Sequence, residues 1–270
     1  MKIVQMSDVH VEEGGKFRPD LLDNVIEETN RLEPDLVAVA GDLTGEGYRK
    51  EFEQAREYMN RLECPNVRYI MGSHDARNVG YRYFEELFGS RSSSTTVTTP
   101  EGEVKVVALD STKPDLDEGE VGREYYAWLD SEFRGWDQGL KILLIHHHLL
   151  AVPGTGRDSN ILRDAGDVMA LLREVEVDLV LSGHRHVPYV WSISGVRVIH
   201  SGTASTERIR GTIGASYNLI EIGPESTQVT LKDSRGEHDQ ALASFSRIPG
   251  RSTELYMDYD RYVSYDELPL

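Results

Sequence analysis

Histidine and aspartate residues recur in this chain directly after short apolar runs, at five separate places. Asp8 and His10 follow the first run, and because they lie two positions apart they point to the same side of an extended chain. The other blocks, in chain order, are Gly41-Asp42, Gly72-Ser73-His74-Asp75, His146-His147-His148 and Gly183-His184-Arg185-His186. Nitrogen and carboxylate ligands without thiolates favour manganese, iron, zinc, cobalt or nickel. The sequence therefore predicts a metal centre, with enough ligands for two divalent transition-metal ions that share a carboxylate.

The apolar runs before these blocks are short and continuous, which is typical of strands covered on both faces of a sheet. They occupy residues 3–6, 36–40, 67–71, 142–145 and 177–181. Amphipathic segments between the runs predict helices over residues 20–32, 49–62, 81–88, 124–133 and 163–175. Alternating strands and helices indicate an α/β fold. Since open α/β sheets build their sites at the carboxyl ends of their strands, we expect the five blocks to meet at one sheet edge.

A second set of strand candidates indicates a further sheet with mixed or antiparallel pairing. It covers residues 104–109, 189–193, 196–199, 217–222 and 228–231, with tight turns such as Ser194-Gly195 between them. From Asp233 onward the sequence becomes polar and carries a late cluster of tyrosines. We therefore predict a catalytic domain over residues 1–232 and a C-terminal extension over residues 233–270. The extension could wrap the domain, be partly disordered, or pack on a partner subunit in a homo-oligomer.

Composition narrows the class of protein further. The 270 residues are 39% hydrophobic and carry a formal charge of −17, from 46 acidic and 29 basic residues. Such a surface repels long nucleic acids, and no apolar stretch approaches the ~20 residues that cross a bilayer. The single cysteine, Cys64, cannot form an internal disulfide, which favours a reducing compartment. We expect a cytoplasmic protein that acts on small molecules, with no membrane segment.

The five blocks resemble, in order and spacing, the D-x-H, G-D, G-N-H-D, H-H and G-H-x-H blocks of the calcineurin-like metallophosphoesterases. The resemblance covers roughly residues 2–231 and is closest to the branch of bacterial cyclic-nucleotide and glycerophosphodiester phosphodiesterases. It implies a four-layer αββα sandwich with two mixed β-sheets and the metal site at the carboxyl ends of the strands. It also implies a first ion held by Asp8, His10, Asp42 and His186, and a second held by Asp42, Ser73, His146 and His184.

One position departs from the family pattern. Ser73 stands where the family has asparagine. A serine hydroxyl is shorter than an amide and is a poorer neutral oxygen donor. We therefore expect the second metal site to be weaker, or to be completed by water.

The resemblance also implies the residues that act on substrate. His74 resembles the family's histidine that contacts phosphate and assists the leaving oxygen. Asp75 resembles the carboxylate that orients this histidine, although a cap on the following helix is an equally good interpretation. In the triple histidine we assign His146 as the ligand by analogy, so that His147 or His148 could face the substrate.

Three residues outside the five blocks are weaker candidates for lining the pocket. They are Arg77, Asn78 and His200, and the simpler interpretation of each is a solvated residue in a loop. We interpret Asp110 as a structural carboxylate at a strand end rather than a ligand.

The resulting prediction is a binuclear phosphoesterase that hydrolyses small phosphodiesters of the cyclic-nucleotide or glycerophosphodiester type by attack of a metal-bound hydroxide. A phosphomonoesterase or a nucleotide pyrophosphatase would use the same core. From another class, the chain could be a metal-binding scaffold whose activity is weakened by the change at Ser73.

Overall fold

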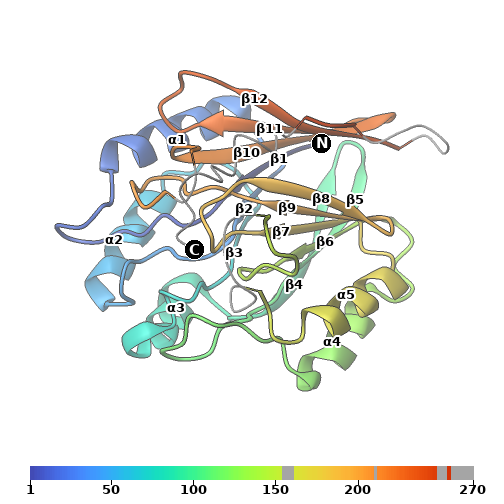
Figure 1. Cartoon of the computed structure of the whole chain (residues 1–270), viewed down its shortest axis with the longest axis horizontal. Coiled ribbons are helices and arrows are strands. Elements are labelled where there is room, and N and C mark those ends of the chain that lie inside the picture. The colour runs from blue at the N-terminus through green and yellow to red at the C-terminus, as the bar shows by residue number, and fades with distance from the viewer. Residues whose placement is uncertain (154–160, 210–211, 248–253, 257–270) are drawn as a thin grey trace, which may run out of the picture.

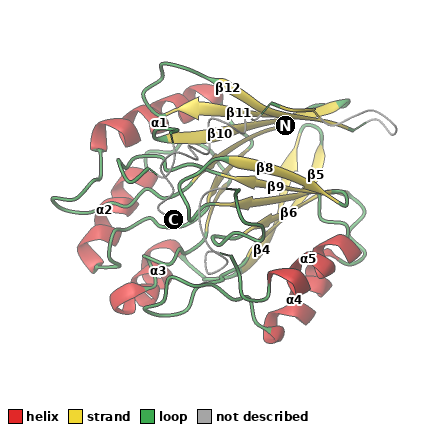
Figure 2. Cartoon of the chain, viewed as in Figure 1, coloured by secondary structure: helices red, strands yellow, loops and turns green. Residues whose placement is uncertain are grey.

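The strands of this computed structural model form two stacked β-sheets with helices on both outer sides (Figure 1, Figure 2). The structure describes residues 1–153, 161–209, 212–247 and 254–256. The first sheet has the strand order β13-β12-β11-β10-β1-β2-β3, and the second has the order β4-β5-β6-β7-β9-β8. Both sheets are mixed, because β1 to β3 and β5, β6, β7 and β9 pair in parallel while the other pairs are antiparallel.

The strand bounds are as follows. The first sheet contains β1 (Lys2–Met6), β2 (Leu36–Val39), β3 (Val67–Tyr69), β10 (Ser216–Ile222), β11 (Ser226–Asp233), β12 (Gln240–Ser246) and β13 (Glu254–Leu255). The second contains β4 (Ser93–Thr99), β5 (Gly102–Ala108), β6 (Gly139–Leu144), β7 (Leu179–Ser182), β8 (Tyr189–Ile193) and β9 (Val196–His200).

Helices cover the outer face of each sheet. The first sheet carries α1 (Pro19–Leu32), α2 (Arg49–Met59) and α3 (Gly80–Phe88), the last preceded by the short 3-10 helix η1 (Arg77–Val79). The second sheet carries α4 (Arg123–Phe133) and α5 (Ala165–Glu174). Helix α1 begins at Pro19, whose fixed φ suits a first helical position, and buries Leu21, Leu22, Val25 and Ile26 on one face. The predicted four-layer αββα sandwich is confirmed.

The continuous hydrophobicity of the central strands follows from these layers. In β1, Ile3 faces the core between the two sheets, whereas Val4 and Met6 face the helices. In β7, Leu181 faces the same inter-sheet core and Val180 faces α4 and α5. Successive side chains of a strand point to opposite faces, so a strand buried on both faces needs apolar residues throughout.

The expectation of a single sheet edge for the five blocks was wrong. Strands β1, β2 and β3, which precede the first three blocks, lie in the first sheet, whereas β6 and β7 lie in the second. Continuous apolar runs show that a strand is buried on both faces, but they carry no information about which sheet it joins. The site is therefore built where the carboxyl ends of two different sheets meet.

The predicted C-terminal extension begins with part of the sandwich. Strand β12 pairs with β11, and its Leu242, Ala243 and Phe245 lie in the core between the sheets. Because the residues of β12 are mostly small or polar, the hydrophobic pattern of the sequence did not indicate this strand. Of the tyrosine cluster, Tyr256 is exposed, and Tyr259, Tyr262 and Tyr265 lie outside the described residues. Residues 240–246 thus belong to the same fold as residues 1–232.

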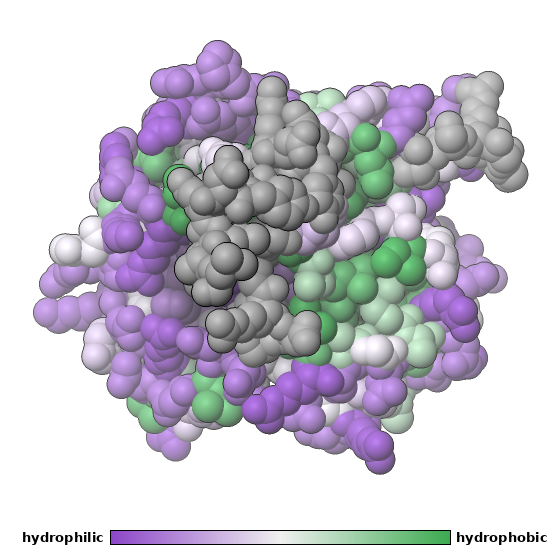
Figure 3. Space-filling model, viewed as in Figure 1, coloured by the Kyte–Doolittle hydropathy of each residue, from purple (hydrophilic) through white to green (hydrophobic). Residues whose placement is uncertain are grey.

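The surface agrees with the charge of the chain. The face in Figure 3 is mostly hydrophilic outside the grey atoms, with a smaller apolar area. No helix within the described ranges has the length and apolar character needed to span a bilayer; the longest, α1, has 14 residues.

Candidate metal centre

The first half of the site is a pair of loops that leave β1 and β2 side by side. The backbone N–H of Asp8 donates to the carbonyl of Gly41, and that of His10 donates to the carbonyl of Asp42, both at 2.9 Å. Asp8, His10 and Asp42 have φ values of 53°, 51° and 51°, a left-handed conformation that aspartate and histidine adopt more readily than most residues. As a result, Nε2 of His10 lies 3.8 Å from Oδ1 of Asp8 and 3.6 Å from Oδ2 of Asp42.

The second half of the site comes from the other sheet. Nε2 of His146, after β6, lies 3.5 Å from Oδ1 of Asp42. Nε2 of His186, after β7, lies 3.3 Å from Oδ1 of Asp8 and 3.0 Å from Nε2 of His10. The ring of His184 is centred 5.1 Å from that of His146. The structure thus brings six of the seven predicted ligands into one cluster that joins the two sheets.

The protonation pattern of the histidines shows that this cluster fits divalent ions. Nδ1 of His146 lies 2.7 Å from the carbonyl oxygen of Ala40, and Nδ1 of His186 contacts the carbonyl oxygen of Arg208. A carbonyl only accepts, so each Nδ1 carries a proton, and each Nε2 presents a lone pair whenever the ring is neutral. These lone pairs face carboxylate oxygens, which are acceptors too. Within the described residues, Nε2 of His146 has no hydrogen-bond partner. A cation between them would satisfy such a buried arrangement.

Glycines let the backbone approach the two carboxylates closely. A Cβ atom on Gly183 would lie 1.7 Å from the Ser7 hydroxyl and 2.6 Å from Oδ2 of Asp8. A Cβ atom on Gly72 would lie 2.1 Å from Oδ1 of Asp42. The space left by these glycines admits backbone N–H donors: that of His184 reaches Oδ2 of Asp8 at 2.9 Å and that of His74 reaches Oδ1 of Asp42 at 2.8 Å. The conformation of both carboxylates is therefore fixed before any ion binds.

Burial and charge set the protonation of the predicted ligands. Burial lowers the pKa of His10 well below its usual value, so this ring is neutral. Burial works against the charged forms of Asp8 and His186, but their mutual attraction outweighs it, so the pKa of Asp8 is lowered and that of His186 is raised. Asp42 and Asp8 raise the pKa of His146 in the same way, against burial. A divalent ion must therefore displace the proton that the carboxylates favour on His146 and on His186.

A cavity of about 120 Å³ opens beside the cluster. Its lining residues are Asp42, Ser73, His74, Asp117, His184, Arg185, His186 and Arg208. Side chains from both sheets therefore face one space, with imidazoles, carboxylates and guanidinium groups around it. A small anion could sit there against ions held by the ligands.

Comparison with known proteins agrees with this geometry. Residues 1–188 match the calcineurin-like phosphoesterase family. The chain belongs to this family. Its members are metal-dependent hydrolases of phosphate esters, so the protein is a metal-dependent phosphoesterase.

Three similar proteins illustrate the relationship. A probable cyclic nucleotide phosphodiesterase of Synechococcus is 26% identical over 195 residues, covering 72% of this chain and 74% of that protein. A probable glycerophosphodiester phosphodiesterase of Arcobacter nitrofigilis is 28% identical over 197 residues, covering 69% and 72%. The purple acid phosphatase of yellow lupin shares the fold, with a TM-score of 0.66 at 15% identity over 91% of this chain and 53% of that one.

His74 of the phosphoesterase lines the cavity. Its Nδ1 lies 2.5 Å from the carbonyl oxygen of Gly45. One of its ring nitrogens lies within 4.8 Å of ligand atoms of both His10 and Asp42. The ring thus stands at the edge of the metal cluster, held from behind by a backbone carbonyl.

Asp75 has a different role from the two that the sequence indicated. Its carboxylate accepts hydrogen bonds from the N–H of Gly72 and Leu43 at 3.0 Å, and from the N–H and hydroxyl of Thr44 at 2.9 and 2.7 Å. These donors occupy the Asp75 carboxylate. The ring of His74 is oriented by the Gly45 carbonyl instead. The N-cap positions of η1 and α3 are Ala76 and Val79, so Asp75 caps neither helix. It ties the loop after β2 to the loop that carries Ser73. Burial raises its pKa to about 6.

The three predicted substrate-binding residues lie around the cavity rather than in its lining. The guanidinium of Arg77 pairs with Glu46 at 3.0 Å and with Asp117 at 2.7 Å. Asn78 is exposed, and its side-chain amide donates to the carbonyl of Glu46 at 3.0 Å. His147 is buried, with Nδ1 at 2.8 Å from the Ser111 hydroxyl and Nε2 at 3.2 Å from the carbonyl of Asp117. These contacts give each side chain a partner within the protein.

His148 and His200, the other weaker candidates, form a buried pair away from the cavity lining. Their rings stack with centroids 3.7 Å apart and an interplanar angle of 25°. Burial lowers the pKa of His148 well below its usual value and that of His200 to about 3, so both rings are neutral. Of the triple histidine, only His146 reaches the carboxylates in the described structure.

Sequence reasoning missed Arg208, Arg185 and Asp117 as lining residues. Arg208 lies in none of the five blocks, and Arg185 lies inside the G-H-x-H block at its variable position. Asp117 follows no strand and no recognisable motif. Loop residues of this kind carry function without a pattern in the sequence.

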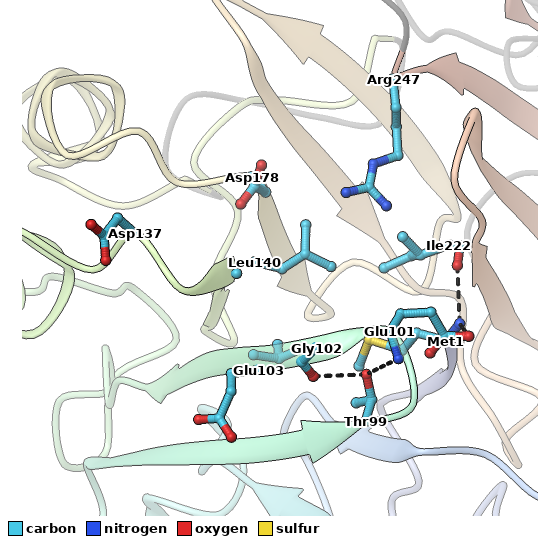
Figure 4. Close-up of a pocket in the computed structure, with 12 residues that line it drawn as sticks. Met1, Thr99, Glu101, Gly102, Glu103, Asp137, Leu140, Asp178, Ile222 and Arg247 are labelled. Carbon is cyan, nitrogen blue, oxygen red and sulfur yellow. Dashed lines mark hydrogen bonds and ion pairs between the residues drawn. The ribbon is translucent and has the colours of Figure 1, made fainter.

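A larger cavity, of about 300 Å³, lies at the opposite ends of the same strands (Figure 4). Met1 and Gly139, at the starts of β1 and β6, help to line it. The N-terminal ammonium there donates to the carbonyl of Ile222 at 3.0 Å and pairs with Glu101 at 2.8 Å. Because the predicted ligands follow the other ends of these strands, this cavity is separate from the metal centre.

Proposed function

We propose that the phosphoesterase uses two divalent transition-metal ions to hydrolyse small phosphodiesters, of the cyclic-nucleotide or glycerophosphodiester type. The observation that carries the proposal is the set of buried, inward-facing acceptor atoms on Asp8, Asp42, His146 and His186. The substrate class rests on the similar proteins, which are named as phosphodiesterases for these two kinds of ester. The acidic charge of the chain further favours small substrates over long nucleic acids.

The ligands divide between two ions that share Asp42. We assign Asp8, His10, Asp42 and His186 to the first ion, and Asp42, Ser73, His146 and His184 to the second. The position of Asp42 supports this division, because its Oδ2 faces His10 and its Oδ1 faces His146. When bound, divalent ions would lower the pKa of water and offset charge on the phosphoryl oxygens.

The chain's own residues then bind and orient the ester. The carboxylates of the site are held by the backbone N–H donors of residues 74 and 184, and two of its imidazoles are held by the carbonyls of Ala40 and Arg208. With its Nδ1 held by the Gly45 carbonyl, His74 would use Nε2 of the doubly protonated ring to give a proton to the departing oxygen.

A screen with two chromogenic esters tests the function. Protein loaded with manganese should hydrolyse bis-p-nitrophenyl phosphate with a higher kcat/KM than p-nitrophenyl phosphate. A preference for the monoester would instead identify a phosphomonoesterase. Tight metal binding without turnover of either ester, or of a cyclic nucleotide or a glycerophosphodiester, would identify a metal-binding scaffold.

Replacing His74 with asparagine should lower kcat by about 10²–10⁴-fold on esters with poor leaving groups, and less on nitrophenyl esters. The backbone N–H at this position still reaches Asp42, so the metal content should stay unchanged. Turnover across a leaving-group series and elemental analysis check both statements. Loss of an ion would make His74 a ligand, and an equal loss across the series would make it a phosphate-binding residue.

Ser73 is 2% exposed and lines the cavity, at the position assigned to the second ion. Ser73→Asn should tighten the weaker of two manganese-binding steps by about ten- to hundredfold, since an amide oxygen is a better neutral ligand. Calorimetric titration of both proteins gives the comparison. Ser90→Asn, on an exposed loop, is the control and should change neither step. Two equally tight manganese-binding steps in the serine protein would show that the hydroxyl does not weaken the second site.

A further inference from the structure

Arg208 lies on a loop that the backbone fixes against the first half of the metal centre. The hydroxyl of Thr203 donates to the carbonyl of Asp8 at 2.6 Å, and that of Ser205 donates to the carbonyl of Val9 at 2.9 Å. The backbone N–H of Arg208 reaches the hydroxyl of Thr206 at 3.2 Å, while its carbonyl accepts from Nδ1 of His186. The position of Arg208 is therefore tied to two of the proposed ligands.

Arg208 is one of the residues that line the cavity beside the metal cluster. Its Nη2 donates to Oε2 of Glu12 at 2.7 Å, and the Glu12 side chain is only 10% exposed. Glu12 also lines a neighbouring groove, so this ion pair stands between the groove and the metal cavity. A guanidinium has five N–H donors, and one contact with Glu12 leaves others directed elsewhere.

We propose that Arg208 binds a phosphoryl oxygen of the substrate, and that Glu12 positions Arg208 and reduces the positive charge it offers. This proposal rests on the function proposed above and names the residue that recognises the phosphoryl group of its substrate. Arginine suits this task because its planar fork matches phosphoryl oxygens. Arg77, whose Nη1 lies 3.1 Å from Nδ1 of His74, also pairs with Glu46 and Asp117 and does not line the cavity.

The pairing of Arg208 with Glu12 has a consequence for specificity. A phosphodiester carries one negative charge, whereas a monoester carries nearly two above about pH 6. An unpaired guanidinium would attract the dianion more strongly than the monoanion. By placing a carboxylate against Arg208, the protein reduces that advantage and favours the diester.

The first test replaces Arg208 with alanine in the manganese-loaded protein. We expect kcat/KM for bis-p-nitrophenyl phosphate to fall about ten- to hundredfold, the scale of one charge-assisted contact. The metal content should be unchanged, because the backbone carbonyl that holds His186 remains. Added guanidinium ion should restore part of the activity of Arg208→Ala and none of that lost in the His74 variant. Arg18→Ala removes a neighbouring arginine of similar exposure, paired with Asp20 and Glu207, and should have no effect.

The second test replaces Glu12 with glutamine, which keeps an oxygen for Arg208 but removes the charge. We expect kcat/KM for p-nitrophenyl phosphate to rise relative to that for the diester by about three- to tenfold at about pH 8. Glu207→Gln is the matched control and should leave the ratio unchanged. If Glu12 had only a structural role, its replacement would lower kcat/KM for both esters by the same factor. That result would overturn the role of Glu12 in specificity.

Binding of inorganic phosphate keeps this test separate from the proposed function. Calorimetry on the manganese-loaded proteins should show phosphate binding at least about tenfold weaker in Arg208→Ala than in the parent. This holds even if no ester tested is turned over, in which case the proposed function alone fails. Equal phosphate affinity in the two proteins, or a loss of metal that matches the loss of activity, would overturn the role of Arg208.

Discussion

Asp42→Asn should lose ions from the metal centre and lower kcat/KM by at least about a thousandfold, because several kcal/mol of transition-state stabilisation come through the ions. The carboxylate lies between the two ligand groups, with Oδ2 3.6 Å from His10 and Oδ1 3.5 Å from His146. Asparagine keeps the size of the side chain and an oxygen for the N–H of His74, so the loop should keep its shape. Elemental analysis and turnover of bis-p-nitrophenyl phosphate measure the outcome.

Asp110→Asn provides the matched control for this substitution. Asp110 is also a buried aspartate after a strand, but it binds Arg91 and Thr112 and lies outside the cavity lining. The Asp110→Asn protein should keep its metal and most of its activity. An Asp42→Asn protein that retains two ions and normal turnover would contradict the shared carboxylate.

Chelation should abolish activity and lower the melting temperature, with both restored by manganese. Ions that bind only the folded chain at about a thousand times their Kd add about 4 kcal/mol each. For a chain of this size, that corresponds to a loss of roughly 10 °C or more on chelation. Differential scanning calorimetry and activity, measured before chelation, after it and after reloading, test the statement. Full activity in protein that elemental analysis shows to be free of metal would refute the proposed chemistry.

Reloading should also depend on pH in a defined direction. The carboxylates Asp42 and Asp8 raise the pKa values of His146 and His186 in the metal-free protein. A ligand histidine must lose its proton before it binds a metal, so a raised pKa extends proton competition to higher pH. As the pH falls, more manganese should therefore be needed for half-maximal activity, and the increase should begin above the usual histidine value of about 6.5.

Much of the fold could be predicted from hydrophobic pattern alone. The segment 124–133 was expected as a helix and α4 spans Arg123–Phe133, while residues 189–193 form β8 as expected. The missed strands had no such pattern. Strand β4 runs Ser93–Thr99 at the edge of its sheet, where polar residues suffice because only Val97 and Thr99 are buried. Small side chains concealed β12 in the same way.

The parts of the site that depend on the type of side chain could be predicted from the sequence. The parts that depend on contacts with backbone groups could not. Each ligand block follows a recognisable strand, so Asp8, Asp42 and His146 could be proposed from the sequence. The tautomer of His186, by contrast, depends on the carbonyl of Arg208, a contact that any residue type could make. The donors that occupy Asp75 are likewise mostly backbone groups brought together by tertiary structure.

The division of the metal centre between two sheets also sets when it can form. His10 and His186 touch although 176 positions separate them, and β1 lies between β2 and the late strand β10. A growing chain on the ribosome holds Asp8 and His10 long before it holds their partners, so it offers an ion only part of the first site. We therefore expect the first site to be complete only after the chain has been synthesised beyond His186. Recovery of activity during refolding would accordingly report the moment at which the two sheets dock, rather than the formation of either sheet alone.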